Sequence, residues 1–173
     1  MIQITFQPAL DPFHAAFRIL RLRPIIAAFG PLHQDQVRIL DFYLTFPFRI
    51  EGIRLIPKHR KYRKLASEYR SAKSYGNQPE DQIIFNRMEP IQIAAFETLA
   101  THNLITPSHL IAHEIQATSA PVPEELVTRV DAANQRDSEL MGFLGVLASE
   151  YELTGTDGLK NRTNLMEYRY DAV

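Results

Sequence analysis

The sequence predicts a mainly α-helical fold with a small β element (α+β), in which helices supply most of the core. Apolar side chains recur every three or four residues in several segments, whereas the segments with alternating apolar side chains are short. The apolar share of 45% is enough for one ordinary core, and 173 residues suit a single domain, with or without an extended arm. We therefore interpret residues 1–173 as one domain with a winged-helix-like core and a long C-terminal amphipathic helix.

The N-terminal part, residues 1–56, begins with an alternating segment at residues 2–6 that is typical of a short strand. Asp11 followed by Pro12 is a helix-start signal, because aspartate caps the first turn and proline suits the first helical position. The helix that follows is expected to weaken near Pro24, since the residue before a proline avoids the helical conformation.

A second helix is predicted at residues 33–46, where apolar side chains follow one face until Pro47. Residues 48–56 are few and alternate in polarity, so they predict a strand or an extended segment. The basic segment, residues 57–75, is expected to continue as a helix as far as Ala72.

Charge is distributed unevenly along the chain, although the formal net charge is only −1. Residues 49–75 contain nine Lys or Arg and two acidic residues, whereas residues 76–173 contain six basic and fifteen acidic ones. This polarity favours a protein that meets a different partner with each region: a polyanion or an acidic protein at the centre, and a basic protein at the C-terminal half. It does not favour an enzyme that acts on small molecules.

The basic segment and the residues just before it carry the strongest local signal for binding. Six cations are predicted to contact the phosphate groups of a nucleic acid: Arg54, Lys58, Arg60, Lys61, Arg63 and Lys64. Such charges supply most of the non-specific affinity of a protein for DNA, and that affinity falls steeply with salt. The same pattern also fits a surface for an acidic protein, or a helix face that is merely solvated.

Residues 79–118 are interpreted as a winged-helix-like part. They predict helices at residues 80–88 and 90–103, separated by Pro90, and a strand at residues 110–118. A helix followed by an Asn turn and a Leu-Ile-Thr-Pro stretch is typical of the end of a recognition helix, although purely structural modules share this pattern.

A long helix is predicted within residues 121–152. Its apolar positions alternate steps of four and three residues and are interrupted once, by Asp137, which gives a heptad-like seam. Such a seam is typical either of a helix packed on its own domain or of a coiled-coil contact with a partner. Because an unpaired buried acid is costly, Asp137 is expected at the solvated end of the seam or against an arginine of a partner.

Two sets of residues are predicted to contact a protein partner. The first follows the seam of the long helix and comprises Leu140, Leu144, Leu147 and Tyr151. The second lies in the C-terminal arm, residues 153–173, and comprises Tyr168, Arg169 and Tyr170. Tyrosine and arginine concentrate binding energy at protein interfaces, so the arm is predicted to bind protein.

Motifs of known catalytic sites are mostly missing from the sequence. It has no glycine-rich phosphate-binding loop and no nucleophile elbow. His113 and Glu114 begin a zinc-protease HExxH motif, but Ala117 stands where the second histidine belongs. A metal-hydrolase interpretation rests only on His109, His113 and Glu114, which are too few for a site. We predict no catalytic residue, no metal ligand and no cofactor.

The composition also bears on location. The sequence contains no cysteine, and no apolar run approaches the roughly 20 residues that a bilayer span requires. Its N-terminus lacks the basic and apolar regions of a signal peptide. We therefore expect a soluble, intracellular protein in the cytoplasm.

Three segments look familiar together: residues 11–20 (DPFHAAFRIL), 39–47 (ILDFYLTFP) and 158–171 (GLKNRTNLMEYRYD). They resemble the middle-component family of ABC-three-component systems, fifth type, and the similarity spans nearly the whole chain. The resemblance implies an accessory subunit of a bacterial anti-phage or anti-plasmid defence complex of the Lamassu kind. In such a complex an SMC-like ATPase hydrolyses ATP and senses DNA, the effector is often a nuclease, and the small subunit is a winged-helix element near the ATPase heads. The resemblance implies no catalytic residues.

Two functions follow as hypotheses. In the first, the chain is a non-catalytic subunit that links an SMC-like ATPase to DNA and to an effector, with its basic centre on phosphate and its long helix and arm on protein. In the second, it is a free-standing winged-helix transcription regulator that reads DNA as a homodimer through residues 90–103. Glu89, Glu97 and the scarcity of basic residues near this helix argue against its entering a DNA groove.

Overall fold

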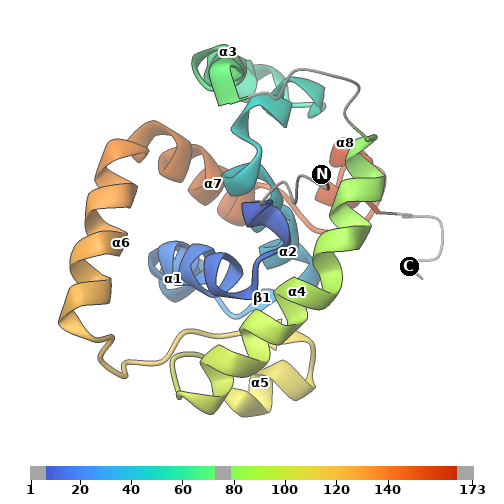
Figure 1. The fold of residues 1–173 in the computed structure, drawn as a ribbon. Helices are drawn as coiled ribbons and strands as arrows, with labels where there is room; N and C mark the ends of the chain where they lie inside the picture. Colours follow the sequence, from blue (N-terminus) through green and yellow to red (C-terminus); the bar gives the residue numbers. More distant parts are fainter. Residues whose placement is uncertain (1–6, 73–78, 167–173) are drawn as a thin grey trace, which may run out of the picture.

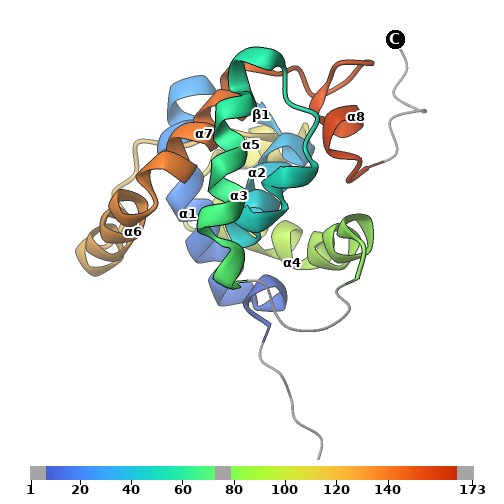
Figure 2. The same cartoon turned by 90° about the horizontal axis from the view of Figure 1, so that it is seen from above.

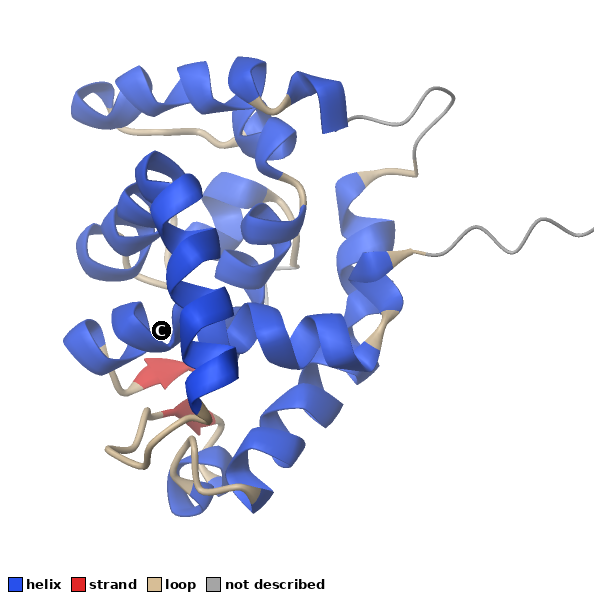
Figure 3. Cartoon of the chain, turned by 60° about the vertical axis from the view of Figure 1, so that its left-hand side comes forward, coloured by secondary structure: helices blue, strands red, loops and turns tan. Residues whose placement is uncertain are grey.

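The computed structural model describes residues 7–72 and 79–166 of the chain. Helices predominate in these two ranges, and a short two-stranded sheet accompanies them (Figure 3). The predicted mainly α-helical fold with a small β element is therefore confirmed. The strand predicted at residues 2–6 lies outside the described residues.

The elements of the described part follow one another in a simple order, with η denoting a 3₁₀ helix. They are η1 (Pro8–Leu10), α1 (Pro12–Phe29), β1 (Leu32–His33), α2 (Gln34–Thr45), η2 (Pro47–Gly52), η3 (Pro57–Arg63), α3 (Lys64–Glu68), η4 (Arg70–Ala72), α4 (Asp81–Thr101), α5 (Pro107–Ile111), β2 (Glu114–Ile115), α6 (Glu124–Arg136), α7 (Ser138–Glu150) and α8 (Leu159–Thr163).

Helix α1 starts as the sequence predicts and ends later. Asp11 caps it, because its carboxylate Oδ1 accepts a hydrogen bond from a backbone N–H of the first turn at 2.9 Å. The helix does not weaken at Pro24 but continues for another turn and more. Ile25 and Ile26, beyond the proline, are buried. Core packing therefore offsets the one backbone hydrogen bond that the proline removes.

Helix α2 lies at the centre, and α1, α4 and α7 pack around it (Figures 1 and 2). Every residue from 36 to 44 is buried, which is typical of a helix covered on all sides. Phe42 is the middle of an aromatic group, with ring centroids of Tyr43, Phe46 and Phe85 at 5.3, 5.3 and 5.8 Å. None of the helices in the described part has the length and apolarity of a membrane span.

The region after α2 is more helical than predicted. The strand or extended segment expected at residues 48–56 begins inside η2, so only its last residues are extended. The basic segment is helical, as predicted, but it consists of η3, α3 and η4 rather than one α-helix. Residues 73–75 of the basic segment lie outside the described residues.

Helix α4 runs without a break through Pro90, whereas the sequence predicted two helices separated there. Met88 and Gln92, on either side of the proline, are fully buried, and α4 packs along α1. Tertiary packing therefore maintains a helix that local preference would end.

The sheet joins distant parts of the sequence. Strands β1 and β2 pair antiparallel with Leu32 opposite Ile115. The strand predicted at residues 110–118 exists but is short, because α5 occupies its first residues. Its partner strand belongs to residues 1–56, so this topology does not confirm the winged-helix-like arrangement predicted for residues 79–118.

The predicted long C-terminal helix is corrected to two helices, α6 and α7, which meet at Asp137 (Figure 1). The backbone of Asp137 has φ −100° and ψ 32°, outside the α-helical values. Val130 and Leu140, on either side of it, are both buried. The chain turns between the two helices so that the apolar positions face the core while Asp137 reaches polar partners.

Candidate nucleic-acid interface

The basic segment lies across one end of the molecule, at the opposite end from α5 (Figure 1). One side of it packs on α7, where the ring of Tyr62 lies 4.9 Å from that of Phe143. The Nδ1 atom of His59 lies 2.8 Å from the hydroxyl of Tyr151, and both side chains are buried. The segment is thus anchored by an apolar and aromatic inner side, which leaves its charged side chains on the outside.

Two of the six predicted phosphate contacts are already paired with acids of α7. Lys58 forms an ion pair with Glu150, and the ammonium of Lys64 lies 2.9 Å from a carboxylate oxygen of Glu139. The hydrogen bond from Lys58 lowers the pKa of Glu150 below its ordinary value. The hydrogen bond to Glu139 raises the pKa of Lys64. Both lysines thus reach acids of α7 at the exposed surface of the basic segment.

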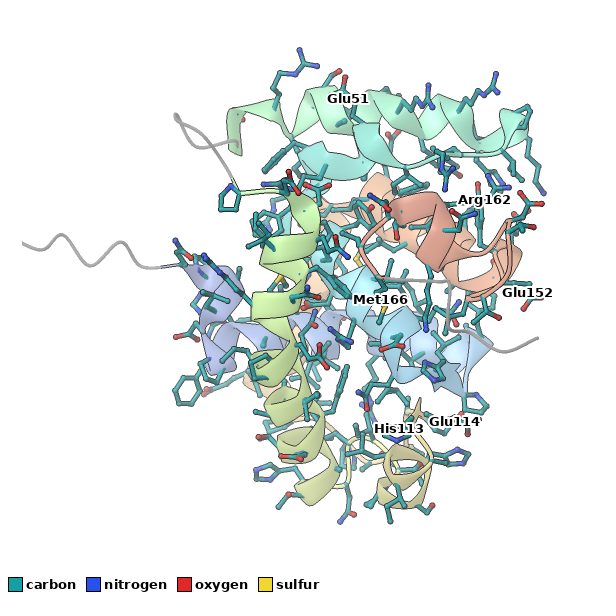
Figure 4. All side chains as sticks on the ribbon, turned by 90° about the vertical axis from the view of Figure 1, so that its right-hand side faces the viewer. Glu51, His113, Glu114, Glu152, Arg162 and Met166 are labelled. Carbon is teal, nitrogen blue, oxygen red and sulfur yellow. The ribbon has the colours of Figure 1, made fainter. Side chains whose placement is uncertain are left out.

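Arg54 also has a structural role. Its guanidinium donates hydrogen bonds to the backbone oxygen of Asn161 and to the Oδ1 of the same residue, the second at 2.5 Å. In return, Arg162 donates from its Nη1 to the backbone oxygen of Arg54 at 2.6 Å. Figure 4 places Arg162 on α8, beside the basic segment. Arg54 therefore holds α8 against the extended residues that follow η2.

Four exposed cations of the basic segment have no carboxylate partner among residues 7–72 and 79–166. We call them the outer cations: Arg60, Lys61, Arg63 and Arg70. Arg60 and Arg63 are three residues apart in η3, and in a 3₁₀ helix such residues project from the same edge. The structure thus places Arg60 and Arg63 along one exposed edge of η3.

Arg70 was not among the predicted contacts. It belongs to the same run of positive charge but stands apart from the dense cluster, separated from it by Glu68. The excess of positive charge across residues 49–75 was the signal that could have identified Arg70. The prediction included only the densest stretch of cations. The helical course of η3, α3 and η4 keeps Arg70 on the exposed side of the basic segment.

The predicted protein contacts along the long helix are corrected by the structure. Leu140, Leu144, Leu147 and Tyr151 are all buried in the core of this chain, with exposed fractions of 1, 0, 0 and 6%. The seam is therefore that of a helix packed on its own domain, the alternative that the sequence left open. The second predicted set, Tyr168, Arg169 and Tyr170, lies outside the described residues.

Asp137 meets an arginine of its own chain rather than one of a partner, and it is buried rather than solvated. Its carboxylate accepts hydrogen bonds from Arg21 at 2.7 Å and from the hydroxyl of Tyr69 at 2.9 Å. Burial acts to raise the pKa of Asp137, but hydrogen bonds from Arg136, Tyr69 and Arg21 outweigh burial and lower it. Burial and the contact with Asp137 raise the pKa of Tyr69 to about 12. This cluster ties α3 and α1 to the junction of α6 and α7.

The histidines considered for a metal site lie far from the basic segment. Figure 4 shows His113 and Glu114 at the α5 end of the molecule. The Nδ1 of His109 lies 2.9 Å from a carboxylate oxygen of Glu114, whereas His113 is exposed in a turn with φ 58°. In the two described ranges, no three His, Cys, Asp or Glu side chains are placed to hold a metal ion.

Comparison with known proteins gives one match. Residues 4–171 match the family described as the ABC-three component (ABC-3C) system Middle Component 5. No curated protein and no solved structure matches the chain. The matched range includes the basic segment, the helices that hold it and the sheet at the other end. Because the match covers nearly the whole chain, this protein belongs to the family of Middle Component 5 of ABC-three-component systems.

Proposed function

We propose that the chain is a non-catalytic accessory subunit of an SMC-like ATPase complex in bacterial anti-phage or anti-plasmid defence, where it links the ATPase to DNA and to an effector. Membership of the middle-component family carries this proposal, because a component of a three-component system acts together with other components. The resemblance of residues 11–20, 39–47 and 158–171 to the same family supports it.

In this role the basic segment contacts DNA through its outer cations. Arg60, Lys61 and Arg63 follow one another within η3 and are exposed. Phosphate contacts of this kind are independent of base sequence and suit a subunit that is held on DNA by a larger complex. Lys58 and Lys64 contribute less, because acids of α7 already neutralise them.

The subunit role is tested by capture of the tagged full-length chain from its native host, with mass spectrometry of the captured proteins. We expect a large SMC-like ATPase in the captured material, both before and after nuclease treatment. Survival of the ATPase after nuclease would show direct contact between the proteins. Recovery of the chain alone, or only with DNA, would reject the role and favour a free-standing DNA-binding regulator.

The DNA contact is tested with two variants that each remove two positive charges from the same segment. Arg60→Gln with Arg63→Gln removes outer cations, and Lys58→Gln with Lys64→Gln removes paired ones. Binding to a fluorescent DNA duplex is measured over a series of salt concentrations. For the arginine variant, the slope of log affinity against log salt should fall by about two, since each phosphate contact contributes about 0.9. An unchanged slope for the arginine variant, or an equal loss in both variants, rejects this assignment.

A further inference from the structure

An open cleft of about 360 Å³ lies between α1 and α6, away from the basic segment. Figure 1 shows α6 standing beside α1, and Figure 3 brings that side of the molecule forward. Six apolar residues line most of the cleft: Leu20, Pro24 and Ala27 of α1, Val122 of the preceding loop, and Val127 and Val130 of α6. Its size and apolar lining fall within the range of ligand sites, roughly 300–1,000 Å³.

The cleft exists because α6 is fastened to α1 at one end. Arg21 of α1 donates hydrogen bonds to Asn134 at 2.9 Å and to Asp137 at 2.7 Å, both near the C-terminal end of α6. The cleft lies beside the earlier turns of α6. There Val127 keeps 38% of its surface exposed. An apolar wall is thus left open to solvent.

Arg23 joins the α1 wall of the cleft to the loop before α6. The Nη2 of Arg23 donates to the backbone oxygens of Thr118 and Ala120 at 2.5 and 2.7 Å, but its Nε is buried without an acceptor among the described residues. Pro24 has no N–H, so the backbone oxygen of Leu20 lacks its usual helical donor.

The α6 wall is acidic. Asp131 lines the cleft, and Glu124 lies seven residues earlier, which places both side chains on one face of the helix. Both residues are exposed, and neither has an ion-pair partner in the part of the chain that the structure describes. A positive charge on a bound partner would complement this wall.

We propose that the cleft binds a segment of a protein partner that carries a bulky apolar side chain next to lysine or arginine. The apolar side chain fills the cleft, and the cation pairs with Asp131 and Glu124. This inference rests on the proposed function, because it supplies a protein-binding surface that a linking subunit requires.

The chain offers a direct readout of this binding, because three of its six valines line the cleft. The full-length chain with ¹³C-labelled valine methyl groups is titrated with a designed helical peptide of leucine and lysine. We expect the methyl signals of Val122, Val127 and Val130 to shift, whereas those of Val37 and Val146 remain in place. Two control peptides, one with alanine for leucine and one with glutamate for lysine, should bind at least tenfold more weakly.

Matched variants on α6 test the charge complementarity. Asp131→Lys should weaken binding of the leucine–lysine peptide at least tenfold. Glu125→Lys makes the same charge change on a different face of the helix, away from Val127 and Asp131, and should have little effect. Unchanged Val37 signals in both variants show that the fold is intact.

Several outcomes overturn the proposal. Absence of binding, or shifts outside the cleft valines, removes the site. Equal weakening by Asp131→Lys and Glu125→Lys leaves only non-specific charge attraction. The small apolar molecule indole serves as a further probe. If indole shifts the cleft valine signals equally in the wild type and in Asp131→Lys, the cleft is a small-molecule site. If the valine signals shift with protein concentration in the absence of peptide, the cleft binds a second copy of this chain. If the peptide does not bind but the SMC-like ATPase is still captured, the cleft proposal is rejected and the subunit role is kept. If the peptide binds but no ATPase is captured, only the subunit role is rejected.

Discussion

Helices α1, α2 and α4, here called the inner helices, and the basic segment use the same charged residue types in opposite ways. In the core, Arg18 donates hydrogen bonds from Nε and Nη2 to the two carboxylate oxygens of Asp41, at 2.6 and 3.2 Å, and both residues are buried. In the basic segment, Arg60 and Arg63 are exposed and have no carboxylate partner among the described residues. Paired buried charge fixes how helices meet, whereas unpaired exposed charge is available to a partner.

The charged and polar side chains that join the inner helices form a continuous network, the inner network, rather than isolated pairs. Gln92 of α4 donates to Asp41 at 2.8 Å and accepts from the Nε of Arg38 at 3.1 Å. Arg38 also forms ion pairs with Asp35 and Glu89 at 2.9 and 3.0 Å. Because each buried member has partners, the network specifies one arrangement of α1, α2 and α4.

The largest effect is expected when the inner network loses an acid. Asp41→Ala leaves the guanidinium of Arg18 buried without its counter-charge, which should lower the free energy of unfolding by about 3–5 kcal/mol. Urea denaturation followed by circular dichroism measures this loss. Replacing both partners, Arg18→Met with Asp41→Leu, should recover much of the stability. If Asp41→Ala alone were as stable as the wild type, buried paired charge would not fix how the inner helices meet.

A core leucine of α7 should show the next largest effect. Leu144→Ala removes a fully buried side chain and should cost about 2–5 kcal/mol in unfolding free energy. Val127→Ala, at a partly exposed site, serves as the control and should cost far less. If Leu144→Ala left stability unchanged but abolished capture of a partner protein, the seam would be an interface after all.

The junction at Asp137 should make stability depend on pH at both extremes. The lowered pKa of Asp137 means that its contribution is present above the ordinary value near 3.8 and is lost as pH falls through the lower folded value. The pKa of Tyr69, raised from 10.0 to about 12, gives a contribution that is complete below pH 10 and lost as pH rises toward 12. Tyr69→Phe should lower the unfolding free energy by about 1 kcal/mol and remove the part of the alkaline loss that Tyr69 contributes. The part due to Tyr43, whose pKa is raised by burial, should remain. Urea midpoints between pH 8 and 12 for both proteins test this, and parallel curves would refute it.

The smallest effect on stability is expected from the exposed ion pairs of the basic segment. Lys58→Gln with Lys64→Gln should leave the urea midpoint close to that of the wild type, because solvent screens such pairs. Comparison at low and high salt would sharpen the result. A large, salt-sensitive drop would show that these lysines, and not only the aromatic contacts beneath them, hold the segment on α7.

The sequence predicted well wherever a local signal had no strong tertiary competitor. The cap at Asp11 and the helical course of the basic segment are examples. It failed where packing overrode local preference, as at Pro24 and Pro90, where each helix continues because buried side chains beyond the proline hold it. For the interface, the sequence identified the charged stretch but not which cations remain unpaired.

By itself, the sequence determined the mainly helical class, the position of the basic segment and the resemblance to the middle-component family, since composition, periodicity and local motifs are properties of neighbouring residues. Tertiary structure decided what depends on distant ones. It turned the long helix at Asp137, because Arg21 and Tyr69 lie far away in the chain and meet the carboxylate only after folding. Tertiary structure also decided which cations are paired. Acids of α7 neutralise Lys58 and Lys64 but not the outer cations, because ion pairs form between residues that the fold brings within a few ångströms.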